Sequence, residues 1–256
     1  MGSDAVQAKV WRELADEFDA WAHTGEVPTL WWRDDDAVED SVQLQRLLQV
    51  AGACPISLAV IPAQVTAQLA ECTAMIPNLA VLQHGWSHAN HAATPPPSEY
   101  PGNRVMAAVR AELAEGRRRL MALFGNRVFP VFVPPFHGFA NRFLPLLPET
   151  GLSVISRIGP RARQRFPDGL TEANVHVALR NWSGNCFCGA EAVLAPVLQH
   201  LRRRRLGQVD RKEPTGIVSH HLVEDEGAYE FMARLMSESG STPGARWLSG
   251  PELFFT

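Results

Sequence analysis

The chain has 256 residues, 46% of them hydrophobic, and its 24 Lys and Arg against 27 Asp and Glu give a formal net charge of −3. A charge this close to neutral excludes the strong field that attracts nucleic acid or an anionic membrane, so we expect a small or neutral partner molecule. The hydrophobic content is enough for one large core, and one domain is the simplest expectation at this length.

The first 21 residues alternate charged and apolar side chains, without the apolar core of a secretory signal. No later stretch approaches the roughly 18 consecutive apolar residues of a membrane span. We therefore expect a soluble, cytoplasmic protein. The cysteines lack the CxxC spacing of a structural zinc site and are too few for a disulfide framework. They are Cys54, Cys72, Cys186 and Cys188.

Short apolar runs alternate along the chain with amphipathic segments, which is the pattern of β-α units. The expected strands are residues 29–33, 56–61, 79–83, 129–133, 153–157, 175–179, 216–219 and 246–248. The expected helices are one before the first strand and residues 40–51, 63–74, 104–124, 142–150, 191–206 and 225–238. Seven or eight such units predict an α/β fold with a parallel sheet, closed or nearly closed into a barrel. Residues 1–27 are expected to add a helix that packs on this barrel, and residues 28–256 to form the barrel itself.

Side chains able to bind a metal follow several of the expected strands. They are Asp34, Asp35 and Asp36 after the first strand, His84 and His88 after the third, His137 after the fourth, and His220 and His221 after the seventh. An α/β barrel builds its active site at the carboxyl ends of its strands, so these groups are expected to converge there. For the carboxylates alone, a helix N-cap cluster is the competing interpretation.

One carboxylate and two imidazoles can hold a divalent metal and leave positions open for water and substrate. Zn²⁺ is the expected ion, and Co²⁺, Ni²⁺ and Mn²⁺ also suit this donor set. His84 and His88 are four residues apart, so a helical turn or a tight turn containing Gly85 brings both rings to one side. A Lewis-acid metal, an Asp that accepts a proton from water and a His that protonates the leaving group together predict hydrolysis of an amide or ester.

The order and spacing of these motifs resemble the polysaccharide deacetylases, the family homologous to the nodulation-type chitooligosaccharide deacetylases, over about residues 28–250. The resemblance implies a distorted (β/α) barrel of about seven parallel strands. It also implies a metal-dependent carbohydrate deacetylase that removes an acetyl or other acyl group from an N-acetylated sugar or related small amide. His84 and His88 match the family's H-x-x-x-H metal ligands. The family's catalytic acid, a His that ends a strand, corresponds to His220 or His221.

The family's Asp-Asp pair supplies a general base and then a metal ligand, and the three consecutive Asp residues leave its register open. Relatives that read Arg-x-Asp-Asp imply Asp35 as the base and Asp36 as the ligand. Those that read Phe-Asp-Asp-Gly imply Asp34 and Asp35 instead. We favour the first register, and Asp35 is functional in both.

Two motifs depart from the family pattern. The third, Arg-x-Pro-Phe or Tyr, corresponds to residues 133–136, and the fourth, Asp-x-x-Asp-Trp, corresponds to residues 178–182. Both members of the Arg-Asp pair that tunes the base are therefore expected to be missing, which indicates a divergent member with altered base tuning. The substrate-binding candidates in these segments are Pro135, Phe136, His137 and Trp182.

Two alternatives remain open. One is hydrolysis of a non-sugar C–N bond, as in allantoin-hydrolysing enzymes on a similar barrel. The other is a non-catalytic, metal-dependent glycan-binding protein. The sequence predicts no nucleic-acid partner and no membrane span, and it leaves a homo-oligomer open.

Overall fold

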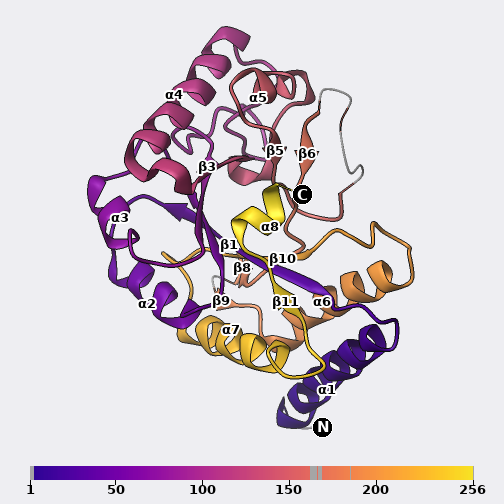
Figure 1. The fold of residues 1–256 in the computed structure, drawn as a ribbon. Helices are drawn as coiled ribbons and strands as arrows, with labels where there is room; N and C mark the ends of the chain where they lie inside the picture. The colour runs from indigo at the N-terminus through magenta and orange to yellow at the C-terminus, as the bar shows by residue number, and fades with distance from the viewer. Residues whose placement is uncertain (1–2, 162–165, 167–168, 185, 256) are drawn as a thin grey trace.

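The computed structural model describes residues 3–161, 166, 169–184 and 186–255, and its centre is a parallel sheet (Figure 1). The strands follow the spatial order β6-β5-β4-β3-β2-β1-β10-β7, and β11 pairs in parallel with the start of β1. Their bounds are β1 Thr29–Ala37, β2 Ile56–Val60, β3 Leu79–His84, β4 Val128–Val133, β5 Val154–Ile155, β6 Thr171–Glu172, β7 Val177–Ala178, β10 Thr215–Ser219 and β11 Arg246–Trp247.

A single segment, residues 171–178, joins the two ends of this sheet. Its first part is β6, which pairs with β5, and its last part is β7, which pairs with β10. Between them, Val175 forms a parallel bridge with Ile158. The sheet therefore curls into a distorted barrel, and if β6 and β7 count as one interrupted strand, the described barrel has about the seven strands expected. The predicted fold class is confirmed.

Most of the helices lie around the outside of the barrel (Figure 1). The exception is α8, whose Phe254 packs in the cluster inside the barrel. The described helices are α1 Ser3–Ala22, α2 Val42–Ala51, α3 Ala67–Cys72, α4 Met106–Phe124, α5 Leu146–Glu149, α6 Ala190–Arg205, α7 Glu226–Ser239 and α8 Gly250–Phe254. The side chain of Ser41 caps α2, and that of Asp225 caps α7. α1 packs against α6, and α2 packs against α7. Among the described helices, none is both long and apolar enough to cross a membrane.

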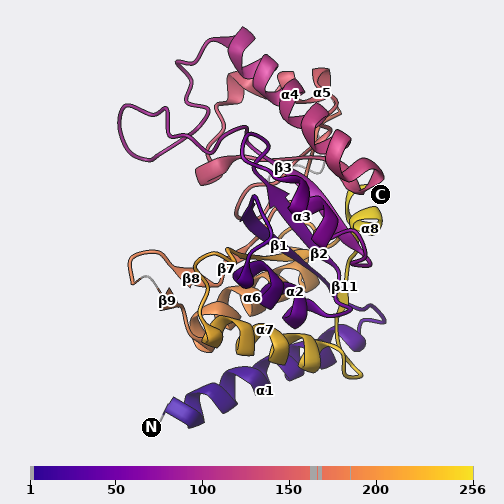
Figure 2. The same ribbon diagram turned by 90° about the vertical axis from the view of Figure 1, so that its left-hand side faces the viewer.

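The helix expected over residues 142–150 is shorter than predicted. A 3₁₀ turn, Asn141–Phe143, precedes α5, and Pro145 and Pro148 remove two backbone donors from the segment. The structure also adds elements that the apolar pattern missed, namely α8 and an antiparallel hairpin of β8 Arg180–Asn181 and β9 Cys186–Phe187. Figure 2 shows this hairpin projecting to the same side of the molecule as the segment between β3 and α4.

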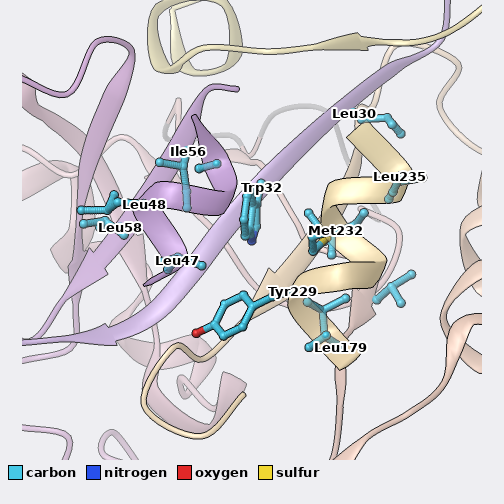
Figure 3. Packing of buried hydrophobic residues seen from close by; sticks show 14 of the residues in the cluster. Leu30, Trp32, Leu47, Leu48, Ile56, Leu58, Leu179, Tyr229, Met232 and Leu235 are labelled. Carbon is cyan, nitrogen blue, oxygen red and sulfur yellow. The ribbon is translucent and has the colours of Figure 1, made fainter. Parts of the chain in front are cut away.

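Alternation along β1 sends successive side chains into two different environments. Trp31 lies in the cluster inside the barrel, and Trp32 lies in the cluster between the sheet and its helices. Figure 3 shows Trp32 between Leu47 of α2 and Met232 of α7. Both tryptophans are only 1% exposed, so both serve the core, as expected for at least one of them. The same alternation decides which way the three following carboxylates point.

Candidate metal centre and catalytic site

The three carboxylates belong to β1 and do not follow it, because the strand continues to Ala37. Its pairing register with β2 shifts between Asp34 and Ala37, and Asp36 adopts a positive φ of 72°. Such an irregularity lets one side chain leave the regular alternation of the strand. A continuous strand of three Asp would put Asp34 and Asp36 on one face, whereas this break aims Asp36 at the two histidines.

Asp36, His84 and His88 form a cluster whose donor atoms all lie within 4.8 Å of one another. Oδ1 of Asp36 is 3.1 Å from Nε2 of His84 and 3.3 Å from Nε2 of His88. His84 ends β3, and His88 follows a turn in which Gly85 has φ +57° and His88 has φ +61°. A tight turn, and not a helix, therefore brings the rings of these two histidines, four residues apart, to the same side.

These residues fit a divalent metal in their chemistry as well as their position. Nδ1 of His84 lies 3.0 Å from the carbonyl oxygen of Val133, which places the ring proton on Nδ1 and leaves the Nε2 lone pair for a metal. Although burial raises the pKa of Asp36, the hydrogen bond and charge of His84 lower it well below its ordinary value. Burial and the neighbouring His84 lower the pKa of His88, which favours the neutral imidazole that a metal needs.

Asp35 points into the barrel and forms an ion pair with Arg33. Arg33, two residues earlier on the same face of β1, donates from Nε to Oδ1 at 2.7 Å and from Nη2 to Oδ2 at 2.9 Å. Nη1 of Arg33 donates to Oγ of Ser156 at 2.7 Å. Burial raises the pKa of Asp35, but Arg33, through its charge and hydrogen bond, together with the charges of His84 and His220 holds this pKa below its ordinary value. The third motif of this chain has no arginine, as expected, but Asp35 is nevertheless paired with one, because β1 itself supplies Arg33.

Asp34 points to the other face of β1, away from Asp35. Its Oδ1 lies 2.5 Å from Nδ1 of His221, and its Oδ2 accepts from Oγ of Ser219 at 2.6 Å and from the backbone N–H of His221 at 3.0 Å. Oγ of Ser219 in turn accepts from Nε1 of Trp32, which packs under α2 and α7. The carboxylate of Asp34 thus holds His221 in the layer between sheet and helices.

His220 lies on the opposite side of the chain from His221. The side chain of Val218 belongs to the cluster inside the barrel, so alternation places His220 on the same side as Asp35. The charge of His220 acts on both Asp35 and Asp36, and the indole of Trp182 meets its ring edge-on at 4.8 Å. Among the described residues, Nδ1 of His220 has no hydrogen-bond partner. The structure thus separates two adjacent histidines that the sequence left equivalent.

The segment after β4 lies against the metal cluster. The ring of Phe136 meets that of His88 at a tilt of 58°, with 4.5 Å between the ring centroids, and Phe136 and His137 both have φ of 57°. Burial and the charge of Arg33 lower the pKa of His137 to about 4, so this ring is neutral near pH 7. Asp36 and His88 also have positive φ, and backbone strain of this kind in non-glycine residues collects at functional sites.

A second cluster of potential ligands, His176, His200 and Glu213, lies elsewhere in the fold. The backbone N–H of Gly216 donates to Nδ1 of His176 at 2.9 Å, and burial lowers the pKa of this histidine, so its single ring proton sits on Nε2. That Nε2 lies 3.3 Å from Glu213 and is a donor, not a metal ligand. The rings of His176 and His200 are stacked at 3.6 Å, which presents parallel Nε2 atoms to the two carboxylate oxygens of Glu213. The imidazoles of His176 and His200 therefore share the buried carboxylate of Glu213.

Comparisons with known proteins support the fold. No protein-family model and no curated protein matches the chain. Among solved structures, a family 4 acetyl xylan esterase from Clostridium thermocellum, in complex with a cobalt ion, is 16% identical with a TM-score of 0.54 over 89% of this chain and 90% of that one. A putative polysaccharide deacetylase from Mycobacterium smegmatis is 14% identical with a TM-score of 0.58 over 88% of each chain. A family 4 carbohydrate esterase from Streptomyces lividans, in complex with acetate, is 14% identical with a TM-score of 0.55 over 89% and 94%.

The chain has the fold of these carbohydrate esterases and deacetylases. Within that fold, the predicted site residues fall into three groups. Asp36, His84 and His88 form the metal cluster, whereas Asp35, His220, Phe136, His137 and Trp182 lie around it. Asp34 and His221 form a separate pair in the layer between the sheet and its helices. Arg33 and Ser156 were not predicted from the sequence, although an Arg and an Asp two residues apart on one strand face could have indicated Arg33.

Proposed function

We propose that the chain is a metal-dependent hydrolase that removes the acetyl group from an N-acetylated sugar. One observation carries the proposal: a two-histidine, one-carboxylate cluster lies beside a buried, arginine-paired carboxylate at the end of the same barrel strand. The structural relatives described as acetyl xylan esterase and carbohydrate esterase support an acetylated carbohydrate as the substrate class.

In this proposal Asp36, His84 and His88 hold the ion, and we favour Zn²⁺ because one carboxylate and two imidazoles are a common open zinc set. When bound, the ion supplies a Lewis acid that polarises the acyl carbonyl and acidifies water. The chain's own contribution is to keep Asp36 ionised and His88 neutral, which their pKa shifts favour, and to hold the Nδ1 proton of His84 on the carbonyl oxygen of Val133 so that Nε2 faces the ion.

Asp35 is the proposed general base. Its pKa stays below the ordinary value although it is buried, so it is ionised throughout the neutral range and can accept a proton from the attacking water. The two hydrogen bonds from Arg33 fix the plane of its carboxylate. We therefore propose the Asp35–Asp36 register, which is the one that the sequence favoured.

His220 is the proposed general acid, which would donate a proton to the departing amine. Its position on the inner side, its Nδ1 without a partner among the described residues and its contact with Trp182 support this role. His221 is less suited, because its Nδ1 is held by Asp34 and it is only 1% exposed on the helix side of the sheet.

Trp182, 59% exposed, lies beside His220, and Phe136, 38% exposed, lies beside His88, so both offer apolar surface at the site. Pro135 and His137 flank Phe136 in the segment after β4. Aromatic faces of this kind suit the C–H face of a sugar ring. We expect Trp182→Ala to raise KM for an N-acetylated oligosaccharide several-fold while metal content stays unchanged.

The test is acetate release from N-acetylated chitooligosaccharides, with and without a chelator. We expect chelator-sensitive release that Asp35→Asn reduces by a factor of about 10² to 10⁴ without loss of metal. Asp16→Asn, an exposed carboxylate of α1, is the matched control and should leave turnover unchanged. Bound metal without acetate release from any N-acetylated sugar would contradict the proposal and favour another C–N substrate.

A further inference from the structure

The turn between the two metal-site histidines is held by a carboxylate from a distant part of the chain. Glu99, in the proline-rich segment before α4, is fully buried. Its Oε1 accepts from the backbone N–H of Ser87 at 2.7 Å and from Oγ of Ser87 at 3.1 Å. Its Oε2 accepts from the backbone N–H of Trp86 at 3.2 Å. Three donors of one turn therefore converge on one side chain.

The remaining polar groups of this turn are held from its other side. The carbonyl oxygen of Trp86 accepts from the backbone N–H of Ala63 at 2.8 Å, and that of Ser87 accepts from Nε2 of Gln64 at 2.9 Å. A side chain at Gly85 would collide with Oε2 of Glu99 and with the ring of Pro135. The turn is thus fixed in one conformation, and the carboxylate of Glu99 occupies the space that glycine leaves open.

The residues beside Glu99 tie it to the segment after β4. Oγ of Ser98 donates to the carbonyl oxygen of Gly138 at 3.2 Å, and the carbonyl oxygen of Tyr100 accepts from the backbone N–H of Ala140 at 3.1 Å. Residues 98–100 therefore connect the turn that carries His88 with the segment that carries Phe136, whose ring contacts that of His88. Glu99 lies at the junction of both connections.

We propose that Glu99 is a positioning residue for the metal site, which holds the His84–His88 turn in its metal-binding conformation and thereby sets the metal affinity. The positive φ of His88 is a strained conformation, and it persists only where surrounding contacts enforce it. Loss of the carboxylate would leave buried N–H groups unpaired and release that strain, so the turn would relax away from Asp36. The inference rests on the metal site of the proposed function.

The experiment measures the Zn²⁺ dissociation constant of the full chain by competition with a chromogenic chelator. Glu99→Gln keeps the shape of the side chain but replaces one accepting carboxylate oxygen by an amide NH₂ group, which cannot accept a hydrogen bond from a backbone N–H. We expect this variant to bind Zn²⁺ more weakly by a factor of about 10 to 100. Glu115→Gln on α4, an exposed carboxylate paired with Arg118, is the matched control and should bind Zn²⁺ as the parent does. The rise in Tm that Zn²⁺ produces should shrink in Glu99→Gln and not in the control.

Ser87→Ala removes one donor to Glu99 and leaves the fold intact, so it keeps the test decisive if Glu99→Gln fails to fold. It should weaken Zn²⁺ binding by a factor of about 3 to 10, the value of one typical intramolecular hydrogen bond. Parental Zn²⁺ affinity in folded Glu99→Gln, or in Ser87→Ala when the first variant does not fold, would overturn the inference. A parent that binds no Zn²⁺ would instead overturn the metal site of the proposed function.

Discussion

Arg33 and Asp35 lie two residues apart on the inner face of β1 and are joined by two hydrogen bonds, while both side chains are essentially excluded from solvent. A strand period of two makes such a pair geometrically natural, because alternate residues share a face. The arginine and the proposed base therefore come from one short segment, and neither depends on the loop after β4.

Arg33→Met should lower the free energy of unfolding at pH 7 by about 3 to 5 kcal/mol, because it leaves a buried carboxylate without its cation. The double variant Arg33→Met/Asp35→Asn should be more stable than the single variant, since no charge then stays unpaired. Urea unfolding at pH 7 measures both. If the single and double variants were equally stable, the unpaired carboxylate of Asp35 would cost little, and the prediction would be wrong.

The loss of stability in Arg33→Met should depend on pH in a definite direction. In the parent, the pKa of Asp35 lies below its ordinary value of 3.8, so its contribution to stability is present above that value and is lost as the pH falls through the folded pKa. In Arg33→Met, burial raises this pKa instead. The stability difference between parent and variant should therefore shrink as the pH falls from 7 to 4, because a protonated Asp35 needs no cation. Urea unfolding across this range is the measurement.

The adjacent histidines should separate in function. His220→Ala should reduce kcat for acetate release by a factor of about 10² to 10⁴ with little change in Tm, since it removes the proposed proton donor at the inner face. His221→Ala should chiefly lower Tm, because it leaves Asp34 buried without its imidazole. Steady-state kinetics and thermal unfolding of the two variants form a matched pair, and the reverse pattern would assign the acid to His221.

The purified chain should bind one Zn²⁺ and not two. Nε2 of His176 is a hydrogen-bond donor when the N–H of Gly216 occupies its Nδ1, so the cluster around Glu213 offers no open lone pair on that ring. Metal analysis should give about one equivalent in the parent and in Glu213→Gln, and far less in Asp36→Ala and His88→Ala. A second equivalent that disappears in Glu213→Gln would contradict this interpretation.

His200 should make the fold sensitive to acid. Burial lowers its pKa to about 4 from the ordinary 6.5, so the unfolded chain binds a proton in this range that the folded chain does not. Stability should then fall as the pH drops below 6.5, by up to about 1.4 kcal/mol per pH unit. His200→Phe should be less stable at pH 7.5 yet lose less stability between pH 6.5 and 4.5. The control is His23→Phe, an exposed site that should keep the parental slope.

The local pattern of the chain was enough to predict the barrel. Apolar runs of strand length alternate with amphipathic segments, and most of these segments became the strands and helices expected. The short hairpin of β8 and β9 and the last helix escaped prediction, because elements of two to five residues carry too little periodicity. The broken strand over residues 171–178 was expected only in its second half, since its first half is held by pairing with β5.

By itself, the sequence determined the donor types at the carboxyl ends of the strands and the four-residue spacing of His84 and His88, and it predicted a functional role for Asp35 that stays a prediction. Only the tertiary structure placed three consecutive Asp and two consecutive His in different surroundings. The reason is geometric: adjacent residues on a strand point to opposite faces, and a bulge at Asp36 changes that alternation. Which carboxylate meets the histidines, which meets Arg33 and which meets His221 depends on strands and turns far apart in the chain, and no local pattern of residues encodes their approach.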